Sequence, residues 1–190
     1  MVDLATRKLP LAGRHGGSSI VRLTPAAPAS RISLRAPADS IGGLSQALGL
    51  QLPTRPKTST SANGRHALWL GPDEWLVIDE NGAELVGLAA SSGALHSATD
   101  VSHRNTAVIV SGSGAEATLA AGCSQDLSLN AFPAGACSRT LYGKAEVVVL
   151  RLDEETFRVE VWRSFSDYVF GLLAEGAEDA ENTFSPAGRR

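Results

Sequence analysis

Cysteine is scarce in this chain of 190 residues, which contains only Cys123 and Cys137. Two cysteines are too few for a disulfide framework or for a zinc site built on thiolates. Disulfides persist mainly in oxidising compartments, so we expect reduced thiols and a cytoplasmic location.

Long hydrophobic runs are also missing. The longest purely apolar stretches, such as Val147–Leu150, have the length of a single strand. A membrane-spanning helix needs about 18 or more apolar residues, so no span is predicted. Charged residues interrupt the first 22 positions, which leaves no apolar core for a signal peptide.

A surplus of positive charge is absent as well. The chain has 17 Lys and Arg against 20 Asp and Glu, a formal net charge of −3. Proteins that bind nucleic acid or anionic membranes neutralise phosphates with an excess of Lys and Arg. The composition therefore argues against both kinds of partner.

Hydrophobic residues make up 43% of the chain, enough for the core of one domain. Residues 1–29 are rich in Gly, Ser, Pro and Ala, and such segments bury too little apolar surface to order themselves. The same holds for residues 176–190. We therefore predict a flexible N-terminal arm, a domain over residues 30–175 and a flexible C-terminal tail.

Periodicity within the domain predicts alternating strands and helices. Strands are expected at 31–35, 67–70, 75–78, 95–101, 106–110, 138–142, 146–152 and 157–162, and helices at 41–48, 81–90, 113–121 and 166–175. The order divides into two pseudo-repeats, about 30–103 and 104–175. Each is typical of a split βαβ (ferredoxin-like) unit, so the predicted fold class is α+β with a mainly antiparallel sheet.

The segment Gly112–Ala117 fits the G-x-G-x-x-A pattern of dinucleotide sites. Such a site needs a second parallel strand ending in an acidic residue about twenty positions later, where this chain has a loop with Pro133 and Gly135. We interpret the segment as a strand-to-helix turn in which Ser113 and Glu116 form a capping box.

Side chains that could carry chemistry are not grouped in the sequence. None of the four histidines has the i, i+4 spacing of a metal pair, and no G-x-S-x-G motif is present. His103 stands between Asp100 and Arg104 and is interpreted as a loop residue. Neither cysteine has an activating base nearby. The sequence predicts no catalytic, cofactor-binding or metal-binding residue on this chain.

Two sets of short motifs run through the middle of the chain. The first is Asp100-Val-Ser-His103, Val108-Ile-Val-Ser-Gly112, Ala115-Glu116, Gln125-Asp-Leu127 and Gly135, and it resembles the folate-binding aminomethyltransferase family. The second is Leu70-Gly-Pro-Asp-Glu-Trp-Leu76, Asp100-Val-Ser-His-Arg-Asn105, Ala121-Gly-Cys123, Arg139-Thr-Leu-Tyr-Gly-Lys-Ala-Glu146 and Phe157-Arg-Val-Glu-Val-Trp-Arg-Ser-Phe165. This second set resembles the gamma-subunit family of heterotetrameric sarcosine oxidase.

The resemblance implies a folate-binding-domain-like fold and a place in a four-chain flavoenzyme of sarcosine catabolism and one-carbon metabolism. Such a complex converts sarcosine to glycine and hydrogen peroxide, with formaldehyde or methylene-tetrahydrofolate as the one-carbon product. FAD, FMN, NAD and tetrahydrofolate are then expected on other subunits, and the alpha, beta and delta subunits are the expected partners. This chain is expected to be non-catalytic. Residues 143–148 lack the Gly-Gly-x-x-Asp-Asp pattern of the catalytic hairpin in aminomethyltransferases.

An accessory subunit needs surfaces for its partners, and the residues predicted to supply them are Trp69, Trp75, Arg104, Lys144 and Arg163. Core packing is the alternative for the tryptophans, and solvated surface charge is the alternative for the three cations. Two other functions stay open at this point. One is a standalone folate-binding one-carbon transferase, and the other is the equivalent subunit of an N-methylglutamate dehydrogenase.

Overall fold

The computed structural model of the chain describes residues 9–184. The helices are Ile41–Leu48 (α1), Leu85–Ser91 (α2), Ala115–Ala120 (α3) and Ser166–Phe184 (α4), with 3-10 turns at Ala38–Ser40 and Arg163–Phe165. One sheet contains, in spatial order, Ser59–Ala62 (β4), Arg65–Gly71 (β5), Glu74–Asp79 (β6), Ser30–Arg35 (β3) and Ser97–Asp100 (β7). The other contains Gly16–Gly17 (β1), Arg22–Pro25 (β2), Asn105–Ser111 (β8), Thr156–Trp162 (β11), Ala145–Arg151 (β10) and Cys137–Tyr142 (β9).

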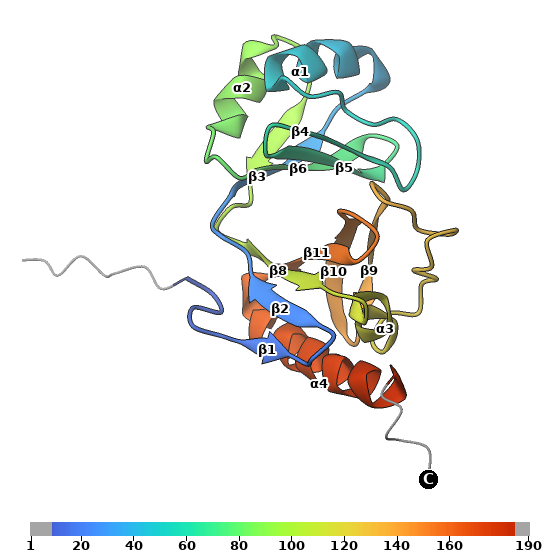
Figure 1. Cartoon of the computed structure of the whole chain (residues 1–190). Helices are drawn as coiled ribbons and strands as arrows, with labels where there is room; N and C mark the ends of the chain where they lie inside the picture. Colours follow the sequence, from blue (N-terminus) through green and yellow to red (C-terminus); the bar gives the residue numbers. More distant parts are fainter. Residues whose placement is uncertain (1–8, 185–190) are drawn as a thin grey trace, which may run out of the picture.

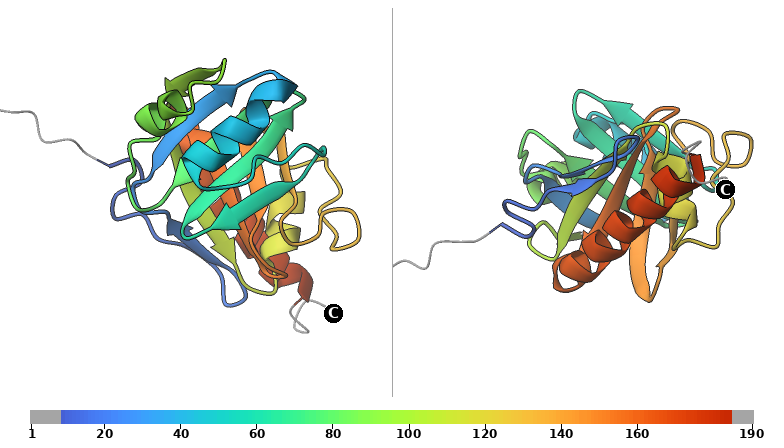
Figure 2. Two further views of the ribbon diagram at one scale, coloured as in Figure 1. Left: turned by 90° about the horizontal axis from the view of Figure 1, so that it is seen from above. Right: turned by 60° about the horizontal axis from the view of Figure 1, so that its bottom comes forward.

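These elements form four layers (Figure 1). Helices α1 and α2 cover the outer face of the five-stranded sheet, and the six-stranded sheet packs against its inner face. Helices α3 and α4 cover the far side, where α4 lies along the six-stranded sheet (Figure 2). No helix within residues 9–184 has the length and apolar character that crossing a bilayer requires.

The central strands are arranged in the same way in both sheets. Strands β3 and β5 each pair antiparallel with β6 and so run in the same direction, with α1 in the connection between them. Strands β8 and β10 flank β11 in the same way, with α3 in the connection. All pairings between the named strands of the described residues are antiparallel, as expected for the predicted α+β class.

The N-terminal segment is part of the second sheet, which corrects the prediction of a flexible arm over residues 1–29. Strand β2 pairs with β8, and Val21 and Leu23 beside and within it are each only 3% exposed. Exposed and buried residues alternate along β2, as in other half-buried strands, but the many Gly, Ser and Pro residues around it hide this pattern in the sequence. Strand β2 covers the edge that β8 would otherwise present to solvent. Residues 1–8 lie outside the described part of the chain.

Helix α4 extends through Phe184, so the prediction of a tail beginning at residue 176 is also wrong. Ala177 and Ala180 are buried and continue the face that begins with Val169 and Leu173. A side chain at Gly176 would collide with the carbonyl of Thr118, so the absent Cβ allows α4 to approach α3 closely. Residues 185–190 lie outside the described range. Tyr168, in the first turn of α4, is 41% exposed.

Two helix starts differ from the sequence prediction. Helix α3 begins at Ala115 after Gly114, without a side-chain cap, so the predicted capping box of Ser113 and Glu116 is wrong. The Glu116 carboxylate instead accepts a hydrogen bond from Arg151 at 3.1 Å. Helix α2 begins at Leu85 rather than near residue 81, because the carboxylate of Glu84 accepts the backbone N–H of Gly87 at 2.7 Å and caps it.

The space between the two sheets holds a buried ionic cluster among apolar side chains. Glu160 of β11 accepts hydrogen bonds from Arg31 of β3 at 2.7 Å and from Arg158 of β11 at 2.8 Å. Arg158 also pairs with Glu80 at the end of β6. The side chains of Arg31, Arg158 and Glu160 are each 1–3% exposed. The cluster therefore joins the two sheets through a pair of residues far apart in the sequence.

Candidate functional site

The glycines of the G-x-G-x-x-A segment pack against the chain itself. Gly112 has a φ of 115°, and a Cβ there would collide with the carbonyl oxygen of Ile20. The backbone N–H of Gly114 donates to that same carbonyl at 3.2 Å. The N-terminal strand region therefore occupies the place where a dinucleotide would approach. The glycines are explained by this close contact, in agreement with the interpretation as a turn.

The histidines are dispersed. His66 lies between the sheets, where burial lowers the pKa of its imidazole below its usual value despite the opposing effect of Glu80. Nδ1 of His96 lies 2.8 Å from the carbonyl oxygen of Ala94. His15 and His103 lie beside a cavity described below. Within residues 9–184, no three His, Cys, Asp or Glu side chains come together as a metal site.

Both cysteines are buried and free of disulfides. The Cys137 thiol donates to the carbonyl of Thr58 at 3.2 Å, and burial raises its pKa to about 12. The thiol therefore stays protonated at neutral pH, and a protonated thiol is a poor nucleophile.

We expect iodoacetamide to leave Cys137 unmodified in the native chain at pH 8 and to alkylate it in urea, as followed by peptide mass spectrometry. The matched control is the urea-unfolded chain at the same pH and reagent concentration. Rapid alkylation of Cys137 in the folded chain would show that its thiol is accessible and ionised.

Three exposed aromatic side chains lie close together in the sequence, where β11 ends and α4 begins. Trp162, Phe165 and Tyr168 are 39%, 43% and 41% exposed, and we call them the aromatic patch. The rings of Trp162 and Phe165 have centroids 6.4 Å apart. Exposed aromatic side chains of this kind are typical of protein interfaces.

Three of the predicted interface residues are exposed beside the aromatic patch. The guanidinium carbon of Arg104 lies 5.2 Å from the ring centroid of Trp162. Arg163 follows Trp162 directly, and the backbone N–H of Lys144 donates to the Tyr168 hydroxyl at 3.2 Å. The structure thus places the Arg104 side chain against Trp162 and the backbone of Lys144 against Tyr168, while Arg163, next to Trp162 in the sequence, also lines the cavity.

The two predicted tryptophans lie elsewhere. Trp75 is fully buried and its indole N–H donates to the carbonyl of Pro53 at 2.7 Å, so it is a core residue and its place in the predicted interface is corrected. Trp69 is partly buried against the same core under α1 and α2. The two residues are direct cross-strand partners in the β5–β6 hairpin, so their side chains share one face of the sheet.

The aromatic patch is absent from the sequence prediction. Trp162, Phe165 and Tyr168 recur every third residue across the end of a strand and the start of a helix. That spacing places helical side chains on one face. From this spacing alone the three aromatic residues would be expected on the buried face of α4. Their exposure depends on how the helix lies on the sheet, which the spacing does not give.

Comparison with known proteins assigns the family. The family model described as "Sarcosine oxidase, gamma subunit family" matches residues 35–179. The chain belongs to this family. The resemblance predicted from the sequence motifs is thereby confirmed.

Curated relatives agree with this assignment. The chain is 32% identical over 136 residues to sarcosine oxidase subunit gamma of Arthrobacter sp, covering 69% of this chain and 67% of the relative. It is 29% identical over 164 residues to the protein of the same name from Corynebacterium sp. (strain P-1), covering 84% and 81%.

Solved structures show the fold. A chain of heterotetrameric sarcosine oxidase from Corynebacterium sp. U-96, solved with pyrrole 2-carboxylate, superimposes with a TM-score of 0.82 at 23% identity, covering 92% of this chain and 96% of that one. Aminomethyltransferase T of the glycine cleavage system from Bartonella henselae gives a TM-score of 0.60 at 15% identity, covering 84% and 49%. The predicted aminomethyltransferase-like α+β fold is confirmed.

Proposed function

We propose that this chain is the non-catalytic gamma subunit of a heterotetrameric sarcosine oxidase and that it supports assembly of the larger subunits. The family match carries this conclusion. In the complex, sarcosine is oxidatively demethylated to glycine with hydrogen peroxide and either formaldehyde or methylene-tetrahydrofolate. The alpha, beta and delta subunits are the partners, and they carry FAD, FMN, NAD and tetrahydrofolate.

A supporting role agrees with the chemistry of the residues described. The space beside the turn of Gly112 and Gly114 is filled by the chain itself at residues 20 and 21. The Cys137 thiol is held in its protonated form. The hairpin between β9 and β10 is a tight turn in which Gly143 has a φ of 58° and Lys144 follows. The only carboxylate close to this turn in the sequence is Glu146, which is exposed. These features favour the gamma subunit over a standalone transferase.

The aromatic patch is the docking surface in this proposal, with one of the larger subunits as its partner. Tryptophan, tyrosine and arginine are the side chains that most often dominate the energetics of protein interfaces. Arg104, Lys144 and Arg163 are exposed around the patch. The partner is therefore expected to present an apolar pocket with carboxylates at its rim.

Replacing the patch tests this role. We expect Trp162→Ser combined with Phe165→Ser to weaken association with the partner subunits at least about 30-fold, because two central aromatic contacts are lost. The readout is the amount of partner chain retained by the tagged subunit at a series of salt concentrations. Thermal unfolding of the isolated variant checks that the fold persists.

Leu95→Ser is the matched control, since Leu95 is 75% exposed and follows α2, which lies on the opposite side of the molecule from α4 (Figure 1). It should leave assembly unchanged. A folded patch variant that retains partners as the unmodified chain does would remove the patch from the interface. The assignment as gamma subunit, which rests on the family match, would stand, and docking would have to use another surface.

A further inference from the structure

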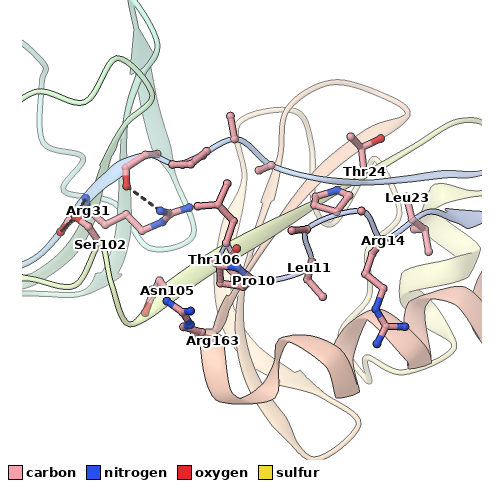
Figure 3. A pocket seen from close by; sticks show the side chains of 18 of the residues that line it. Pro10, Leu11, Arg14, Leu23, Thr24, Arg31, Ser102, Asn105, Thr106 and Arg163 are labelled. Carbon is pink, nitrogen blue, oxygen red and sulfur yellow. Dashed lines mark hydrogen bonds between the residues drawn. The ribbon is translucent and has the colours of Figure 1, made fainter. Parts of the chain in front are cut away.

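A cavity of about 930 Å³ opens where the N-terminal segment passes between the two sheets (Figure 3). Its walls come from residues 9–16, 22–31, 102, 103, 105 and 106, together with Gly82 and Arg163. Small-molecule sites usually measure about 300–1,000 Å³, so the cavity has room for such a ligand. Nothing in the proposed docking function requires it.

One wall of the cavity is apolar and held in place. It consists of the consecutive residues Pro25, Ala26, Ala27 and Pro28. The backbone N–H of Ala26 donates to the carbonyl of Ala107 at 2.9 Å, and the carbonyl of Ala29 accepts a hydrogen bond from the buried Arg31 at 2.9 Å. The two prolines restrict the backbone further. This wall is therefore formed before any ligand arrives.

The charge around the cavity is of one sign. Arginine supplies four of its lining residues, and none of those within the described part of the chain is Asp or Glu, although acidic residues outnumber basic ones in the whole chain. Arg31 is paired with Glu160, and Arg14 with Asp167. The exposed Arg22 side chain has no ion-pair or hydrogen-bond partner within residues 9–184.

We propose that the cavity binds a small organic anion with an apolar body. The anionic group faces the arginines, with Arg22 as its main partner, and the body packs against the wall of residues 25–28. Guanidinium groups form strong charge-assisted hydrogen bonds with carboxylates and related anions. A preformed apolar wall with a few polar groups is the usual design of a small-molecule site.

The test uses two fluorescent probes that differ in charge. 8-Anilinonaphthalene-1-sulfonate carries one anionic group on an aromatic body, and N-phenyl-1-naphthylamine has the same body without the charge. We expect the full chain to bind the anionic probe with one-to-one stoichiometry and more tightly than the neutral one. Arg22→Gln should weaken binding of the anion about tenfold and leave the neutral probe unaffected.

Two further variants control the experiment. Ala27→Trp places a large side chain at the exposed wall and should abolish binding of both probes. Arg55→Gln removes an exposed arginine from a loop that does not line the cavity and should change neither affinity. Thermal unfolding of each variant confirms that the chain is folded.

Equal affinity for the two probes, or binding that survives both Arg22→Gln and Ala27→Trp, would overturn the proposal and locate the probes on another apolar surface. The same titration on the purified complex separates a ligand from a partner segment. Retained binding of the anion supports the small-molecule site. Loss of binding only in the complex would show that a partner chain fills the cavity, which contradicts the proposal but leaves the docking function intact.

Discussion

Glu160→Gln is expected to lower the free energy of unfolding by about 3–5 kcal/mol, the cost of removing one partner from a buried ion pair. The carboxylate is 1% exposed and accepts hydrogen bonds from Nε of Arg31, Nη2 of Arg31 and Nε of Arg158, at 2.7, 3.1 and 2.8 Å. Glutamine keeps the shape but leaves the buried Arg31 guanidinium without a counter-charge, and Arg158 with only its pair to Glu80. The amide N–H₂ group of the glutamine would also face the guanidinium N–H donors of Arg31 and Arg158.

Urea denaturation measures this loss as a shift of the midpoint at constant slope. Glu155→Gln is the matched control, because Glu155 is an exposed carboxylate just before β11, and its replacement should change the midpoint little. An apolar replacement of Arg31, Arg158 and Glu160 together should recover most of the loss, since none of the three buried charges of this cluster then remains. A Glu160→Gln midpoint equal to that of the control would show that the ionic cluster does not stabilise the packing of the sheets.

Arg151→Met is expected to destabilise the chain by about 3–5 kcal/mol, because several carbonyl groups lose a charged hydrogen-bond donor together. The Arg151 side chain is 1% exposed. It donates to the carbonyls of Leu127, Phe132 and Glu154 at 2.7, 3.0 and 2.8 Å. Its guanidinium carbon lies 4.5 Å from the ring centroid of Phe157.

These bonds fix the long connection between α3 and β9. Residues 121–136 of the described chain belong to no helix or named strand, and the arginine side chain holds this connection in place of regular backbone pairing. Amide hydrogen exchange should therefore show protection lost in this connection before the strands are affected. Arg151→Lys is the informative companion, since an ammonium group cannot reach several carbonyls with a planar fork. Protection in the Met variant equal to that of the unmodified chain would contradict this role.

The strands and turns with clear local signals were predictable from the sequence. The β5–β6 hairpin follows from two apolar runs around Gly71-Pro-Asp-Glu74, and the end of α1 follows from Gly49, which has a φ of 63°. These features depend on nearby residues. The face-to-face packing of the two sheets depends on residues far apart in the sequence, and it explains most of the differences between the predicted and the observed structure.

Polar residues that alternate with apolar ones usually face solvent, so the strand pattern alone favours surface positions for Arg31, Arg158 and Glu160. The second sheet covers them, and the partner of Arg31 is 129 residues away in the sequence. The same long-range packing explains β2, whose composition suggests a flexible segment until β8 supplies its partner. Deleting residues 1–28 would therefore expose the core of the six-stranded sheet, and it tests folding rather than docking.

Among the predicted interface residues, the three cations are exposed around the aromatic patch, while Trp75 lies in the core. The role of the cations stays a prediction that the assembly experiment tests. The aromatic patch could not be predicted from the sequence, because the sequence does not show which turn of α4 first contacts the sheet.

The central claim is that this chain works as a subunit of a flavoenzyme. Native mass spectrometry, with an absorbance spectrum, on the tagged chain purified from its own cells tests it directly. We expect a complex of four different chains that shows flavin absorbance and oxidises sarcosine. A colourless free monomer, in cells that contain the other subunits, would contradict the account.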